Sequence, residues 1–227
     1  MGRLAPVALV VVLVAPFGWA ESRSHGTPAR GSLEGGVSLA TAGQGFVTYS
    51  RLGTWTGRQY VHSRVRDTLM AAFSALHAVR PERVFVVGET GLKGGGRFRP
   101  HRTHQNGLSV DIFMPVVDDA GRSVPMPTPA WRKFGYGLEF DPAGRGDGLA
   151  VDFTSLADLI AELGRQGRAR GLEIERVIVA PEYVDRVLAA RRGELAGWAA
   201  RFMRQPAWVR HDEHVHVDFQ LARPDRS

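Results

Sequence analysis

Cysteine is absent from all 227 residues of the chain. Its absence excludes disulfides, thiol catalysis, cysteine–zinc sites and lipid attachment to an N-terminal cysteine. A protein without disulfides must therefore draw its stability from its core or from a bound metal.

Lysine is nearly absent as well, because Lys93 and Lys133 are the only two. The net charge of +6 and the sequence pI of about 10.4 therefore come from arginine. A basic surface favours acidic partners. However, the chain has no run of five Lys or Arg and no recognisable nucleic-acid module. We therefore expect no nucleic acid among its partners.

A second long apolar stretch is also missing. The only one, LAPVALVVVLVAPFGWA, follows Arg3 and ends with small residues at Gly18 and Ala20. This pattern predicts a secretory signal peptide over residues 1–20. The run is shorter than the roughly 20 residues of a comfortable membrane span. We expect a single mature domain over residues 21–227 without stable membrane insertion after cleavage, and an uncleaved anchor is the alternative.

Periodicity in the rest of the chain predicts interleaved helices and strands. Apolar residues at three- and four-residue steps are typical of amphipathic helices, and β-branched or alternating segments are typical of strands. The predicted helices cover residues 62–80, 154–170 and 181–203. The predicted strands cover residues 83–87, 108–113, 174–180 and 214–221.

Two stretches lack long periodic patterns. Residues 21–57 are rich in Gly, Ser and Thr and predict an extended arm with short strands. Residues 115–150 are rich in Pro, Gly and Asp and predict a long excursion, which in a small domain is usually functional or disordered. Together the elements favour an α+β fold, with a small antiparallel β-sheet core, flanking helices and long loops.

Histidine is concentrated in two short segments, HRTHQNGLSVD (101–111) and HDEHVH (211–216), which hold five of the eight histidines. On a strand, His214 and His216 face the same side, and Asp111 faces away from the aliphatic residues of its own strand. If the two strands are neighbours, four or five metal-competent groups converge. The alternative for either segment alone is an ordinary polar strand face. Their coincidence predicts a metal site on the sheet.

Four segments carry a family resemblance: GTPARGSLEGGV (26–37), THQNGLSVDI (103–112), RVIVAPEYVDRVL (176–188) and HDEHVHV (211–217). Their pattern resembles the zinc peptidase superfamily of lysostaphin-type enzymes, D-Ala-D-Ala peptidases and the hedgehog signalling domain. Within it, the chain most resembles the penicillin-insensitive murein endopeptidases, over about residues 25–222. The two histidine segments are specific to the pattern, and the other two support it.

The resemblance implies one Zn²⁺ per chain, held on the sheet by His104, Asp111 and His216. It implies catalytic roles for His214 and His211. His101 matches a histidine near the metal and is expected to be an accessory ligand or to support the ligands. No histidine lies between His104 and His211, so a second zinc is not predicted.

The implied reaction is hydrolysis of D-alanyl–diaminopimelyl cross-links in peptidoglycan, in the periplasm. The expected partners are peptidoglycan stem peptides, whose carboxylates Arg99 and Arg102 could hold. Glu213 competes with His214 and His211 for the role of general base. Two rival functions stay open: a D-Ala-D-Ala carboxypeptidase or dipeptidase, and a non-catalytic exported binding module that zinc stabilises. The oligomeric state is not predicted.

Overall fold

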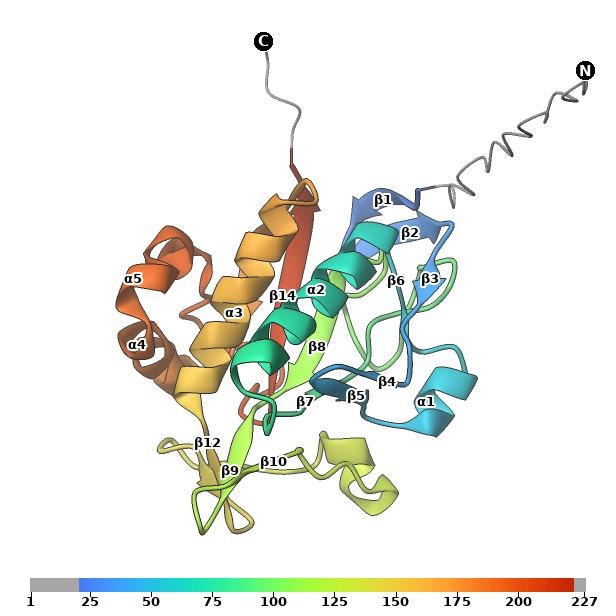
Figure 1. Ribbon diagram of the computed structural model, residues 1–227. Coiled ribbons are helices and arrows are strands. Elements are labelled where there is room, and N and C mark those ends of the chain that lie inside the picture. Colours follow the sequence, from blue (N-terminus) through green and yellow to red (C-terminus); the bar gives the residue numbers. More distant parts are fainter. Residues whose placement is uncertain (1–20, 223–227) are drawn as a thin grey trace, which may run out of the picture.

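A six-stranded sheet forms the centre of the computed structural model, which describes residues 21–222 (Figure 1). Neighbouring strands are antiparallel except for β5 and β7, which are parallel. The predicted α+β class is confirmed, and the antiparallel arrangement holds for the strands that carry the histidines. The strand order is β13 (Leu172–Ile178), β14 (His214–Leu221), β8 (Ser109–Phe113), β7 (Phe85–Val87), β5 (Phe46–Thr48) and β4 (Ala42–Gly43).

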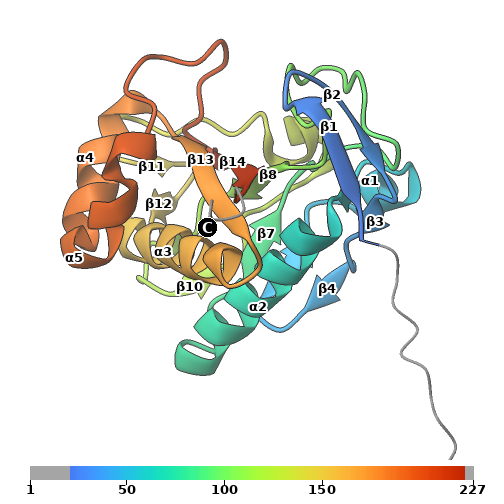
Figure 2. The same cartoon turned by 90° about the horizontal axis from the view of Figure 1, so that it is seen from above.

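Two long helices, α2 (Ser63–Val79) and α3 (Phe153–Arg168), lie side by side across one face of this sheet (Figures 1 and 2). Each begins with a side-chain cap: His62 accepts the amide of Arg64, and Asp152 accepts the amide of Ser155. Their apolar stripes pack against the sheet to form the core, so both predicted helices are confirmed within two residues.

Alternation along β14 decides which side chains join that core. Val215, Val217 and Phe219 are fully buried in the apolar cluster that includes the helix stripes. Because successive strand residues point to opposite faces, His214 and His216 lie on the side away from the helices. These histidines are also buried.

Short elements fill the N-terminal arm. A hairpin of β1 (Arg23–Thr27) and β2 (Arg30–Glu34) is followed by β3 (Val37–Ser38), which pairs with β6 (Tyr60–Val61). The predicted extended arm with short strands is confirmed, with the addition of α1 (Arg51–Trp55).

The excursion at residues 115–150 holds a second small sheet. Its strand order is β10 (Ser123–Val124), β9 (Val116–Asp118), β12 (Leu149–Val151) and β11 (Arg145–Gly146). A short 3-10 helix, η1 (Ala130–Gly135), lies between β10 and β11. Strands of two or three residues are too short to show an alternating pattern, which is why the sequence predicted only a loop here.

The prediction of one helix over residues 181–203 was wrong. The segment divides into α4 (Pro181–Ala190), α5 (Arg192–Leu195) and the 3-10 helix η2 (Ala196–Arg201). Arg191 has non-helical backbone angles (φ −143°, ψ 57°) and ends α4. Glycines follow at 193 and 197, and glycine weakens helix continuity.

None of the helices within residues 21–222 is both long and apolar enough to cross a membrane. The predicted signal peptide, residues 1–20, lies outside the described residues. The boundaries of the predicted single domain stay a prediction.

A tight turn at Asn106 and Gly107 leads the histidine loop into β8. The Asn106 side chain accepts the amide of Leu108, and Gly107 has a φ of +74°. A Cβ at Gly107 would lie 2.6 Å from the Leu33 side chain and 3.0 Å from the His62 amide nitrogen. Only glycine satisfies both constraints without strain.

We predict that Gly107→Ala lowers the free energy of unfolding by about 1–3 kcal/mol, because it forces a Cβ into a left-handed position. Urea denaturation measures this. Gly94→Ala is the matched control, since no atom of residues 21–222 lies within 4 Å of a Cβ there. Equal effects of the two substitutions would contradict the assignment of strain to the turn.

Candidate metal centre

Asp111 lies at the centre of a buried polar cluster on β8. Strand β14 pairs with β8 so that His216 stands directly opposite Asp111. The adjacency on which the predicted convergence depends is therefore present. His216 Nδ1 lies 2.8 Å from Asp111 Oδ1, although the two residues are 105 positions apart in the sequence.

His104 approaches the same carboxylate oxygen from the loop before β8. Its φ of +67° is in the left-handed region, which is uncommon for a non-glycine residue and often occurs at functional positions. His104 Nδ1 lies 3.2 Å from the carbonyl oxygen of Thr90 and donates to it. The other nitrogen, Nε2, therefore carries a lone pair and lies 3.3 Å from Asp111 Oδ1.

His104 Nε2 is buried and has no hydrogen-bond partner among residues 21–222. Burial lowers the pKa of His104 more than the neighbouring Asp111 raises it, so the ring is neutral. A neutral nitrogen lone pair and a carboxylate oxygen repel each other unless a cation lies between them. The orphaned nitrogen therefore fits the role of a metal ligand.

His216 is held between two carboxylates. Its Nε2 lies 2.8 Å from Asp218 Oδ1, and Ser109 Oγ donates to that same oxygen at 2.6 Å. With its Nε2 proton donated to Asp218, His216 presents Nδ1 to Asp111. A carboxylate behind a ligand imidazole is a common support in metal sites. From the protein groups alone, burial lowers the pKa of His216, but Asp218 and Asp111 outweigh it and raise the pKa to about 10.

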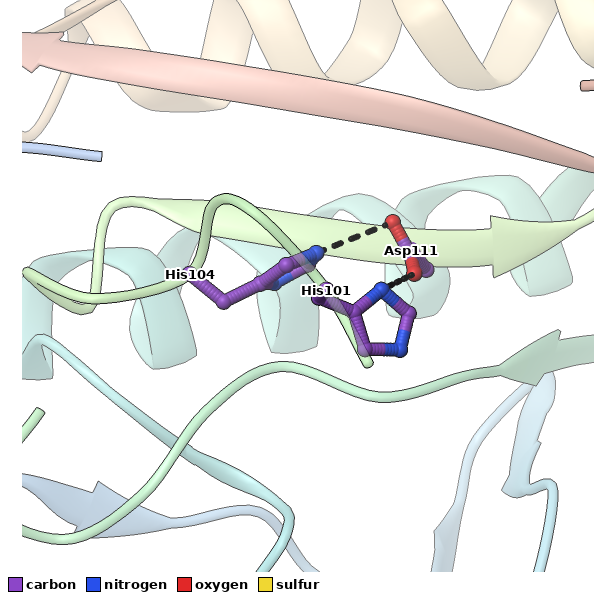
Figure 3. Close-up of side chains that lie close together, drawn as sticks. All are labelled: His101, His104 and Asp111. Atoms are coloured by element: carbon purple, nitrogen blue, oxygen red, sulfur yellow. Dashed lines mark ion pairs between the residues drawn. The ribbon is translucent and has the colours of Figure 1, made fainter. Parts of the chain in front are cut away.

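His101 faces the second oxygen of Asp111, with its Nδ1 3.7 Å from Oδ2. Figure 3 shows the imidazoles of His101 and His104 turned toward this carboxylate. Ligand atoms of these three residues all lie within 4.8 Å of one another. The structure thus brings together all four residues that the sequence placed at or near a metal: His101, His104, Asp111 and His216.

Glu89 fixes the orientation of His101, and sequence reasoning missed it. Glu89 Oε2 lies 2.6 Å from His101 Nε2. The same carboxylate accepts Arg58 and the Tyr49 hydroxyl. Burial opposes ionisation of Glu89, but Arg58 and His101 outweigh it and lower its pKa to about 2. No local pattern marks Glu89, which follows β7 without a histidine or aspartate beside it.

His214 lies beside the cluster and pairs with Glu213. His214 Nδ1 lies 3.0 Å from Glu213 Oε1, and its Nε2 lies 3.8 Å from Asp111 Oδ2. Burial lowers the pKa of His214, but Asp111 and Glu213 raise it above its ordinary value. Burial raises the pKa of Glu213.

His211 packs against His214 with ring centres 4.5 Å apart and the rings tilted by 41°. Its Nδ1 donates to the Val209 carbonyl at 2.9 Å, which leaves Nε2 as an acceptor. Burial and the neighbouring His214 lower the pKa of His211 to about 3. The two histidines therefore differ in proton affinity, which is the usual arrangement of an acid–base pair.

Tyr136 is a second residue that sequence reasoning did not place at the metal. Its hydroxyl donates to Asp111 Oδ2 at 3.1 Å and accepts the Glu89 amide at 2.8 Å. The residues before it, Lys133, Phe134 and Gly135, all have positive φ (50°, 57° and 98°). Consecutive positive φ values are costly and occur where surrounding structure demands them. Burial and Asp111 raise the pKa of Tyr136, so its hydroxyl stays protonated and can donate.

A cleft of about 570 Å³ opens over the cluster. Its lining includes Asp111, His211, His214 and His216, so the catalytic candidates and the cluster share one opening. The rim carries Lys133 and Arg210 among its cations and Trp208 among its aromatic residues.

Arg99 and Arg102 do not line that cleft in the described part of the chain. Arg102 stacks on Trp208 with its guanidinium carbon 5.0 Å from the ring centre. Arg99 is exposed, and its backbone carbonyl accepts Arg58. Their predicted contact with substrate stays a prediction.

Comparison with protein families gives one match. The family model described as penicillin-insensitive murein endopeptidase matches residues 24–226. The chain belongs to this family. The search of curated proteins gives no match for it. The murein endopeptidase family consists of metallo-endopeptidases that hydrolyse peptidoglycan. This chain has a His-His-Asp cluster that could hold a metal ion. The resemblance that the histidine segments indicated is confirmed.

We predict that Tyr136→Phe weakens metal binding by about 10- to 100-fold, because Asp111 loses the donor that orients it. Zinc affinity is measured by competition with a chelating dye. Tyr60→Phe is the control, because no hydrogen bond of its hydroxyl occurs among residues 21–222. Unchanged zinc affinity in the Tyr136 variant would show that the hydroxyl does not support Asp111.

Proposed function

We propose that this murein endopeptidase binds one Zn²⁺ through His104 Nε2, Asp111 Oδ1 and His216 Nδ1. The observation that carries the proposal is the pair of imidazole nitrogens that face one carboxylate oxygen, at 3.3 Å and 2.8 Å. Two imidazoles and one carboxylate are a donor set that zinc prefers in catalytic sites. The orphaned His104 Nε2 supports this choice.

His101 is proposed as a residue that supports the site rather than as one of the three ligands. Its Nδ1 is farther from Asp111 than the nitrogens of His104 and His216 are, and it faces Oδ2 instead of Oδ1. The Glu89 carboxylate holds it there. Its distance still allows it to serve as an accessory ligand.

Zinc in this position would activate a water molecule for attack and polarise the scissile carbonyl. His214 is the proposed general base, because its Nε2 faces the cluster while Glu213 holds the opposite nitrogen. Glu213 then orients His214 and stabilises its protonated form. His211 Nε2 opens onto the same cleft as an unprotonated acceptor, where it can orient substrate or receive a proton.

The proposed substrate bond is the D-alanyl–diaminopimelyl cross-link between two peptidoglycan stems, and the proposed compartment is the periplasm. Membership of the murein endopeptidase family supports a peptidoglycan substrate. The cations at the cleft rim suit the free carboxylates of the stems. Lys133 and Arg210 line the cleft and Arg102 stands behind Trp208, so these residues are proposed contacts, with Arg99 beyond them.

We predict that His216→Ala lowers zinc affinity by more than about 100-fold. Loss of a residue that only supports a ligand costs up to about 100-fold, and loss of a ligand itself should cost more. The measurement combines zinc content with release of monomeric muropeptides from cross-linked dimers, which should stop. His77→Ala, which removes an imidazole from helix α2, is the control. If His216→Ala retains zinc and His101→Ala loses it, the proposed ligand set is wrong. The ligands would then be His101, His104 and Asp111.

We predict that His214→Ala lowers kcat by about 10²- to 10⁴-fold, the usual contribution of a general base, with zinc still bound. Glu213→Gln should lower kcat by no more than about tenfold, because an amide still accepts the His214 Nδ1 proton. Steady-state cleavage of a cross-linked dimer measures both. Near-total loss in Glu213→Gln with zinc retained would move the base assignment to Glu213.

A further inference from the structure

A second cavity, of about 470 Å³, lies beside the catalytic cleft and has no role in the function proposed so far. Thr103, in the loop between His101 and His104, lines both cavities. Residues on the polar face of β14 also line both cavities. His216 belongs to the catalytic cleft, and Asp218, two residues further along the same face, belongs to the second cavity. The second cavity therefore continues the path of the first past the cluster.

The wall of the second cavity is the β1–β2 hairpin, where Ser24 and Gly26 line it. Within residues 21–222, β1 pairs with β2 alone. Ser24 stands opposite Leu33, but the Leu33 amide donates outward, to Gly94, at 2.9 Å. Ser24 and Leu33 are thus a pair that exchanges no hydrogen bonds.

Because antiparallel pairs alternate between bonded and non-bonded types, Gly26 and its partner Gly31 are also non-bonded. The backbone N–H and C=O of Ser24 therefore point away from β2, into the cavity that Ser24 lines. Gly26 has a φ of +71° and departs from this regular strand geometry. An exposed strand edge of this kind is a template for an extended peptide, which adds itself as a further strand.

Charge in the second cavity suits an acidic peptide. Arg176 lines it, is exposed, and makes no ion pair or side-chain hydrogen bond with any residue the structure describes. Asp218 is already committed to His216 and Ser109. Glu175 is the other carboxylate in the lining. A free guanidinium beside a strand edge can bind a peptide carboxylate while the edge binds the peptide amides.

We propose that the second cavity is a subsite that binds one of the two stems of the cross-linked substrate. The stem lies along the outer edge of β1, with a carboxylate on Arg176. This inference rests on the proposed function, since a cross-link continues in two directions from the scissile bond. An endopeptidase needs a groove on both sides of its metal, and the two cavities supply the two sides.

Two variants test the subsite. Arg176→Ala removes the cation. Ser24→Pro removes the outward amide and leaves the β1–β2 bonds intact, because proline is tolerated on an outward-facing edge position. Each should raise KM for a cross-linked dimer of two full stems by about tenfold, the effect of one lost charge-assisted or edge hydrogen bond. The kcat and the zinc content should stay at the wild-type level.

Matched variants and truncated substrates complete the experiment. Ser24→Ala retains the amide and is expected to recover the wild-type KM. Arg165→Ala, on helix α3, controls for loss of an exposed arginine. Two further dimers each lack one stem beyond the cross-link. One of these dimers lacks the stem that the second cavity is proposed to bind. With that dimer, the KM of the wild type should rise to the KM of the variants.

The outcomes are distinct. Wild-type KM in both variants would overturn the subsite. The proposal would also be overturned if the variants kept the same raised KM, relative to the wild type, with both truncated dimers. The residues would then affect KM without contacting a stem. Failure of the wild type itself to cleave any cross-linked dimer with zinc bound would instead overturn the proposed function.

Discussion

The register between β8 and β14 is the constraint on which the rest of this site depends. It places Asp111 opposite His216, and a slip of one residue would turn every side chain of β14 to the other face. The apolar residues of both strands fix that register by packing against α2 and α3. Formation of the core and assembly of the polar cluster are therefore one event.

Both carboxylate oxygens of Asp111 make several buried polar contacts. Its Oδ1 faces His104 and His216, while its Oδ2 accepts Tyr136 and faces His101 and His214. Its pKa is held well below the usual value, since neighbouring histidines outweigh the effect of burial. A buried carboxylate is costly unless it is paired. The surrounding imidazoles offset the cost of burying the Asp111 carboxylate, and a bound divalent cation would offset it further.

The sequence could identify the histidines because their spacing is local: a His-x-His on a strand and a turn before Asp111 are visible in a few letters. It could not place Tyr136 or Glu89 at the cluster. Tyr136 reaches it from a loop whose strands are too short for a pattern, and Glu89 reaches it from the end of β7. Their roles depend on long-range contacts and on the positive φ values at 133–135. The break in the helix after Ala190 was missed because Arg191 is a good helix former. Its backbone angles end the helix, and the glycines that follow weaken its continuation.

His216 lies on β14, the last element of the described chain, while Asp111 and His104 lie more than a hundred positions earlier. Contacts between such distant positions form late, because closing so long a loop is slow and entropically costly. During folding, the first half of the site is completed only when β14 inserts between β13 and β8. A chain truncated before β14 therefore holds an incomplete hydrolase, because the site lacks His216 until that strand is in place.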